Sequence, residues 1–107
     1  MPMKNPPHPG RGLKADFDEL NLTTAQAAEA LGISRNQLHR VVSGQSDISP
    51  ELALRLEIVI GSTAETWLRM QAAYDAAKVR SRADEIGKGL KRIPVPAAPA
   101  PEQPHLV

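Results

Sequence analysis

Apolar residues recur at helical spacing through the middle of the chain, and no stretch alternates strictly between apolar and polar positions. Leu13, Phe17 and Leu20 form one stripe of a first helix, which ends at the Asn21-Leu22 pair. Four more helices follow, and each has an apolar side. The apolar residues of these four are Ala27, Ala28 and Leu31, then Leu38, Val41 and Val42, then Leu52, Leu56 and Ile60, and last Trp67, Leu68, Met70, Tyr74 and Ala77. The pattern predicts an all-α fold of five helices.

Capping residues mark where the second and third of these helices begin. Thr23 and Gln26 predict a capping box, in which the hydroxyl accepts from an unpaired backbone N–H and the amide reaches back. Ser34 and Gln37 predict a second capping box. Gly32 lies between the two, where the chain must turn in the left-handed conformation. Two short helices joined by a three-residue turn that begins with glycine have the spacing of a helix-turn-helix motif.

The predicted third helix carries polar residues on the side opposite its apolar stripe. In a helix-turn-helix motif, the second helix enters the major groove with its N-terminal residues at the base edges. Arg can donate two hydrogen bonds to guanine, and Asn can pair with adenine. No acidic residue occurs from position 33 to 45, and acidic residues would be repelled by phosphates. We therefore expect base contacts from Arg35, Asn36, His39 and Arg40.

Contacts with the DNA backbone are expected on both sides of this helix. The N-terminus of the preceding helix can hold a phosphate with its backbone N–H groups and its dipole. The residues expected to contact the DNA backbone are Thr23, Thr24, Gln26, Ser34, Gln37, Ser43, Gly44 and Gln45. Exposed Arg, Asn and Gln are also common on solvated helices, so a module that binds only protein through this face stays an alternative.

The fifth predicted helix supplies the candidate dimer interface. Trp67, Met70, Tyr74 and Ala77 form an apolar stripe along it. Trp67 could instead close the core of the monomer together with Leu68. Two-fold pairing would place two recognition helices about 34 Å apart, where they could read a palindrome as a homodimer.

Composition narrows the function classes. The 107 residues include no Cys, and 13 basic against 12 acidic residues give a formal net charge of +1. A disulfide framework and a thiolate metal site are therefore excluded, as is a uniformly basic chain. No apolar run spans a membrane and no secretory signal is recognisable, so the expected location is the cytoplasm, with no membrane partner. Neither metal-ligand spacing nor a nucleophile–base pair occurs, so we expect no enzyme, no metal, no cofactor and no small-molecule substrate.

Proline content separates the two ends of the chain from its middle. Of ten prolines, four precede Gly10 and five follow Ile93. We expect a flexible N-terminal arm at 1–9, a helix-turn-helix DNA-binding domain at 10–77, a basic C-terminal helical extension at 78–93 and a disordered Pro/Ala-rich tail at 94–107. The cations of the extension could contact phosphate or a partner protein, or they could be solvated near the negative end of a helix.

Several motifs together resemble the HigA-type antitoxins, XRE helix-turn-helix proteins related to Cro and the phage repressors. The turn carries Leu31-Gly32-Ile33-Ser34-Arg35-Asn36, which many repressors share in similar form. More specific to the HigA type are His8-Pro9-Gly10 near the start, then Trp67-Leu68 and Gln71-Ala72-Ala73-Tyr74-Asp75. The resemblance covers about residues 8–77 and implies a lambda-repressor-like helical bundle.

The resemblance also implies a function. Such proteins are antitoxins of type II toxin–antitoxin pairs, which bind and inhibit an mRNA-cleaving toxin of the HigB/RelE class. They also repress their own operon as dimers on palindromic operator DNA. The base-reading positions of related repressors correspond here to Arg35, Asn36 and Arg40, whereas Thr24 stands where a phosphate-binding Gln is usual. A stand-alone Cro-like repressor without a toxin partner is the alternative.

Overall fold

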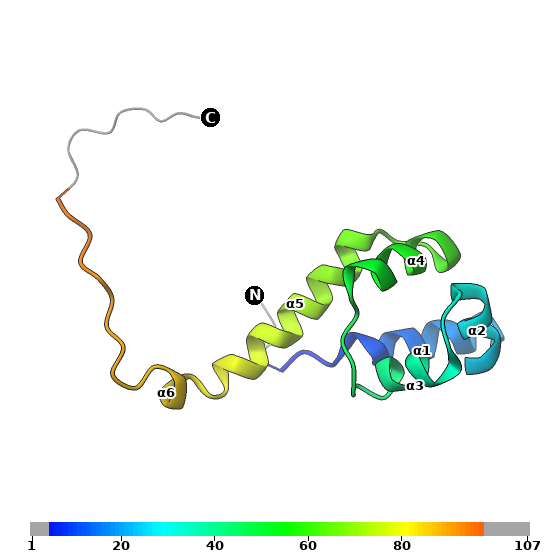
Figure 1. The fold of residues 1–107 in the computed structure, drawn as a ribbon, viewed down its shortest axis with the longest axis horizontal. Coiled ribbons are helices and arrows are strands. Elements are labelled where there is room, and N and C mark those ends of the chain that lie inside the picture. Colours follow the sequence, from blue (N-terminus) through cyan, green and yellow to red (C-terminus); the bar gives the residue numbers. More distant parts are fainter. Residues whose placement is uncertain (1–4, 98–107) are drawn as a thin grey trace.

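The computed structural model describes residues 5–97, and within that range the chain forms helices and no strand (Figure 1). The helices are α1 (Pro9–Glu19), α2 (Thr24–Leu31), α3 (Arg35–Val42), α4 (Pro50–Ile60), α5 (Ala64–Arg80) and α6 (Ala83–Ile86). The predicted all-α class is confirmed, and the short α6 is added to the five expected helices. None of the described helices is both long and apolar enough to span a membrane.

One apolar core lies between α1, α2, α3, α4 and the first half of α5. Leu13 and Phe17 of α1 meet Leu38 of α3 and Leu56 of α4 there, and all four are almost completely buried. Trp67 closes the core from the α5 side, with its indole N–H donating to the Gly61 carbonyl oxygen at 3.4 Å. The second half of α5 runs away from the bundle, as does the chain that follows it (Figure 1).

The first helix begins earlier than the apolar pattern indicated. His8 is its N-cap, and its Nδ1 accepts a hydrogen bond from the Gly10 N–H at 2.9 Å. His8 and Pro9 are buried, so the N-terminal arm predicted at 1–9 is too long, and residues 1–4 lie outside the described part. Gly10 lets α1 approach α3 closely, because a Cβ at this position would collide with the Val41 carbonyl oxygen.

The helix-turn-helix elements have the expected caps, with one difference. The capping box of Thr23 and Gln26 is complete, with hydrogen bonds of 3.1 and 2.9 Å. Gly32 has the left-handed conformation, with φ of 73°. Ser34 accepts from the Gln37 N–H at 3.0 Å, but the side chain of Gln37 does not bond back to Ser34. The second predicted capping box is therefore only half formed, and the Gln37 amide stays exposed to solvent.

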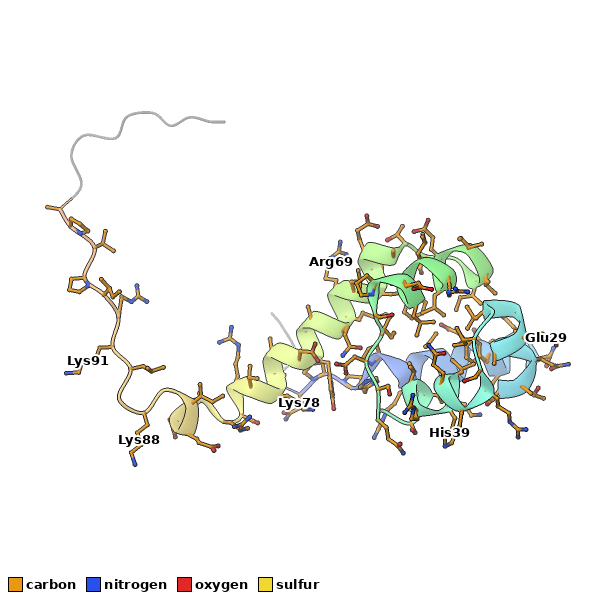
Figure 2. The ribbon with its side chains drawn as sticks, viewed as in Figure 1. Glu29, His39, Arg69, Lys78, Lys88 and Lys91 are labelled. Carbon is orange, nitrogen blue, oxygen red and sulfur yellow. The ribbon has the colours of Figure 1, made fainter. Side chains whose placement is uncertain are left out.

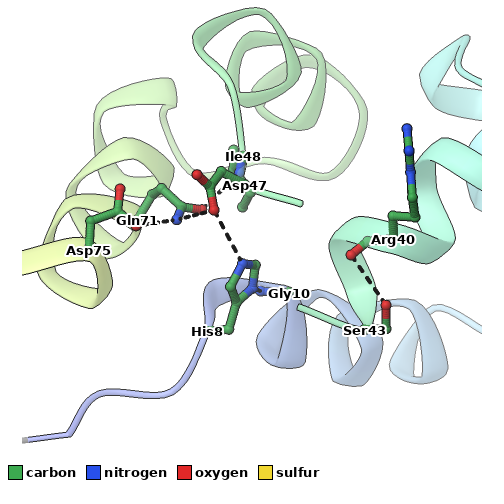
Figure 3. Close-up of polar contacts among 8 residues, drawn as sticks. All are labelled: His8, Gly10, Arg40, Ser43, Asp47, Ile48, Gln71 and Asp75. Carbon is green, nitrogen blue, oxygen red and sulfur yellow. Dashed lines mark hydrogen bonds and ion pairs between the residues drawn. The ribbon is translucent and has the colours of Figure 1, made fainter. Parts of the chain in front are cut away.

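A buried amide connects α5 to the loop that follows α3 (Figure 3). The Oε1 atom of Gln71 accepts from the Ile48 N–H at 2.8 Å, and its Nε2 donates to Asp47 at 3.1 Å and to Asp75 at 3.0 Å. The Oδ1 atom of Asp47 also lies 3.9 Å from Nε2 of His8. These contacts join α1, α5 and the loop after α3 at one point.

The C-terminal segment differs in part from the basic helical extension that we expected at 78–93. α5 ends at Arg80, and α6 begins after a turn at Ser81 and Arg82. From Gly87 to residue 97 the chain has no regular helix, and every residue from 81 to 97 is exposed. The predicted disordered tail at 94–107 lies mostly outside the described residues.

The N-cap of α1 generates a stability prediction. His8→Ala removes the acceptor for the Gly10 N–H, and we expect the free energy of unfolding to fall by about 1–2 kcal/mol. His8→Asn keeps an oxygen that can accept this bond, so it should lose less. Urea unfolding followed by circular dichroism measures both variants. Equal losses would mean that the packing of the ring against Tyr74, and not the cap, is what stabilises this end.

Candidate nucleic-acid interface

α3 has one buried side and one polar, exposed side. Leu38 and Val41 are 0% and 2% exposed and hold the helix against the core. The four residues predicted to contact bases, Arg35, Asn36, His39 and Arg40, are all exposed. Figure 2 shows His39 pointing away from the bundle. The structure therefore places the predicted base-contacting side chains on one helix, whose opposite side packs against the core.

The start of α2 lies beside the start of α3. Thr24, Arg35, Asn36 and His39 together line an open depression of about 550 Å³. The backbone N–H groups of Thr24 and Ala25 make no hydrogen bond within residues 5–97. These N–H groups and the positive end of the α2 dipole are suited to an anion. A phosphate near α2 and a base edge near α3 could thus be contacted at once.

Within residues 5–97, the two arginines of α3 have no internal partners. Ion pairs in the described part of the chain involve other residues, such as Lys14 with Asp18 and Arg82 with Glu85. Neither Arg35 nor Arg40 takes part in an ion pair there, and α3 itself contains no acidic residue. Their guanidinium groups therefore keep all their hydrogen-bond donors for an external acceptor.

The residues predicted to contact the DNA backbone lie at the two ends of α3 and at the start of α2. Thr23, Gln26 and Ser34 use one side-chain atom each to cap a helix, which leaves the hydroxyl hydrogens and the Gln26 amide nitrogen free. The Ser43 hydroxyl instead donates to the Arg40 carbonyl oxygen at 3.3 Å (Figure 3). Gly44, with φ of 84°, and Gln45 follow it and are both exposed.

Arg55 positions the helix-turn-helix turn, and we did not predict this role. Its Nη1 donates to the Leu31 carbonyl oxygen at the end of α2 at 2.9 Å, and Glu51 accepts from its Nη2 at 2.8 Å. A Cβ on Gly32 would lie 2.8 Å from the same guanidinium. The only signal in the sequence is a single cation within an otherwise apolar stretch of α4, and that signal does not identify the carbonyl it contacts.

The candidate dimer residues divide into two groups. Trp67 is 5% exposed and belongs to the core of the subunit, which was the alternative left open, so we remove it from the proposed interface. Met70 is exposed, whereas Tyr74 and Ala77 are half-buried. The Tyr74 ring packs edge-on against His8, with 4.8 Å between ring centroids. An apolar strip therefore remains on the part of α5 that leaves the bundle.

Known proteins share this architecture. A family model described as helix-turn-helix matches residues 13–68. The antitoxin HigA-1 of Vibrio cholerae is 34% identical over 84% of this chain and 86% of its own length. The Pseudomonas aeruginosa antitoxin HigA, solved with the higBA promoter, has a TM-score of 0.76 and 27% identity over 81% of this chain and 97% of that one. Another P. aeruginosa structure, solved with 18 bp of operator DNA, has a TM-score of 0.77 and 26% identity over 89% of this chain and all of that one.

The contact made by Arg55 can be tested by mutation. Arg55→Ala leaves the Leu31 carbonyl oxygen without its donor, so we expect the free energy of unfolding to fall by about 1 kcal/mol. Arg69→Ala is the matched control, because Arg69 is exposed on α5 and makes no hydrogen bond or ion pair within the described residues. Urea unfolding compares the two variants. A similar loss in both would show that the bond to the turn contributes nothing beyond the charge.

Proposed function

This chain belongs to the helix-turn-helix family and is a relative of the HigA antitoxins, and we propose that it represses its own operon by reading operator DNA with α3. The observation that carries the proposal is the outward face of α3, where Arg35 and Arg40 are exposed and have no ion-pair partner in the described chain. Two solved structures of similar proteins contain promoter or operator DNA, which supports the same use of this fold.

In the proposed complex, α3 lies in the major groove. Arg35 and Arg40 donate to guanine O6 and N7, and Asn36 pairs with adenine N6 and N7. The free N–H groups at the start of α2, together with the amide of Gln37, bind phosphates on one side of the groove. Ser43, Gly44 and Gln45 approach the backbone on the other side. Phosphate contacts fix the register, and the α3 side chains select the sequence.

We further propose that the protein acts as a homodimer through the apolar strip of α5. Met70, Tyr74 and Ala77 are the contact residues, and two-fold symmetry brings the same surface of both copies together. The two recognition helices then read half-sites about 34 Å apart on a palindrome. A monomer would make half of these contacts and bind much more weakly.

The second proposed partner is a HigB/RelE-like toxin that the protein neutralises. The support comes from a relative named as an antitoxin and a similar structure solved with the higBA promoter. Co-expression with the gene next to its own tests this proposal. Co-purification of a small mRNA-cleaving protein would support it. A neighbouring gene whose product neither binds this protein nor cleaves mRNA would favour the stand-alone Cro-like repressor.

The base contacts give a DNA-binding prediction. Arg35→Ala or Arg40→Ala should weaken binding to duplexes that the wild type selects from a random pool by about 1–3 kcal/mol, and should relax base preference. Arg69→Ala removes the same charge on the opposite side of the molecule from His39 (Figure 2) and should bind nearly as the wild type does. Fluorescence anisotropy at several salt concentrations measures the affinities.

The same titration distinguishes the competing functions. Wild-type affinity should fall with salt at a log–log slope of about −0.9 per phosphate contacted. A flat salt response would favour the module that binds only protein. Equal losses on selected and random duplexes would mean that the two arginines touch phosphates and not bases.

The dimer surface gives a separate prediction. Met70→Asp places a charge in the proposed contact, so we expect the dimer to dissociate already at higher protein concentrations than the wild-type dimer does, and operator binding to weaken. Met70 is 40% exposed, so the subunit should stay folded. Leu20→Asp is the control, because Leu20 is 52% exposed on the end of α1. Sedimentation velocity measures both variants, and an unchanged dimer in Met70→Asp would move the interface elsewhere.

A further inference from the structure

The segment after α5, which we call the C-terminal arm and define as residues 81–97, exposes apolar side chains without covering them. Leu90, Ile93 and Val95 are 71%, 83% and 79% exposed, and Ile86 on α6 is exposed as well. α6 packs against the end of α5, and no residue of the arm is buried. An isolated subunit gains nothing from presenting this set of side chains to water, so they are suited to contact another molecule.

The similar solved structures match more of the chain than the part that ends with α5. The whole chain up to Arg80 makes up about three quarters of the 107 residues. The two P. aeruginosa structures match 81% and 89% of the chain, so the matches continue beyond α5. A second copy of the same chain is a partner that is present wherever the protein is made.

A surface that fits the arm lies on α4. Leu54, Ile58 and Val59 are all exposed there, and Ile58 is 73% exposed. The charges of the two surfaces are complementary. The arm carries Lys88, Lys91 and Arg92 and no acidic residue from 86 to 97, as Figure 2 shows for the two outward-pointing lysines. α4 and the first turn of α5 carry Glu51, Glu57 and Glu65 against one cation, Arg55, which already pairs with Glu51.

Symmetry brings these two surfaces together. Two α5 helices that pair antiparallel through Met70 and Tyr74 are centred near residue 72, so Arg80 of one copy lies opposite Ala64 of the other. Ala64 is the first residue of α5, next to the end of α4 at Ile60. The arm of one subunit therefore starts at the corner between α4 and α5 of its partner. Parallel pairing would carry both arms away from these corners and leave both apolar surfaces uncovered.

We propose that the C-terminal arm crosses to a second copy of this chain and packs Leu90, Ile93 and Val95 against Leu54, Ile58 and Val59 of the partner subunit. The inference rests on the proposed α5 dimer and adds to it an exchanged arm. An extended chain advances about 3.3 Å per residue, so the arm is long enough to follow the whole of α4, which rises about 1.5 Å per residue. The interface would then include the α5 pair and, in addition, the contact of each arm with α4 of the partner subunit.

The absence of native cysteine makes the contact directly testable. Subunits that carry only Ile58→Cys are mixed with subunits that carry only Leu90→Cys, and a short bis-maleimide reagent is added. The expected product is a covalent heterodimer, which can form only between subunits. The matched control mixes Leu20→Cys subunits with Leu90→Cys subunits, because Leu20 is exposed at the far end of α1 and should not be cross-linked. A control that cross-links as well as the test pair would overturn the proposal.

A second measurement uses the arm itself. The double variant Leu90→Asp with Ile93→Asp should raise the dissociation constant of the dimer by at least about tenfold, since two large apolar contacts are lost. Leu20→Asp should leave it unchanged. A dimer of unchanged affinity overturns the arm exchange while the α5 dimer stands. A wild-type protein that stays monomeric overturns both, and loss of DNA binding alone concerns only the proposed function.

Discussion

The buried amide of Gln71 joins α5 to the loop that follows α3. It accepts from the Ile48 N–H at 2.8 Å and donates to Asp47 and Asp75 at 3.1 and 3.0 Å. Leaving such a buried group unpaired costs about 1–3 kcal/mol, so only one placement of α5 against the loop after α3 is favourable. The helix proposed to read DNA and the helix proposed to dimerise are therefore held in a defined orientation. In a dimer, that orientation sets the distance between the two recognition helices.

In α3, the residues that stabilise the fold and the residues proposed to recognise DNA lie on opposite sides of one short helix. Leu38 and Val41 supply the packing, and the turn before them is held by Gly32 and by the guanidinium of Arg55. The outward side chains take no part in this packing. An exposed cation without a partner costs little, because water screens it. The outward residues can thus be chosen for a DNA sequence without changing how the subunit folds.

The exposed apolar side chains are distributed unevenly between two halves of the subunit. α1, α2 and α3 bury almost all of their large apolar side chains, whereas α4, α5 and the arm expose several, among them Ile58, Met70 and Leu90. The half of the subunit that carries the helix proposed to bind DNA leaves little apolar surface uncovered. The other half has the composition expected of a surface that another protein chain covers. A dimer with exchanged arms would explain why these side chains lie where they do.

The helical class, the helix-turn-helix spacing and the outward face of α3 could be predicted before any coordinates, because all three follow from local periodicity and from capping residues such as Thr23 and Ser34. Contacts between residues far apart in the chain emerged only once the helices were packed. Burial of His8 shortened the predicted N-terminal arm, and burial of Trp67 moved it from the interface to the core. Arg55 bonds to the Leu31 carbonyl oxygen and Gln71 bonds to Asp47, and each of these partners is 24 residues away in the chain. Such pairings arise from how helices pack, and the order of residues along one helix does not contain them.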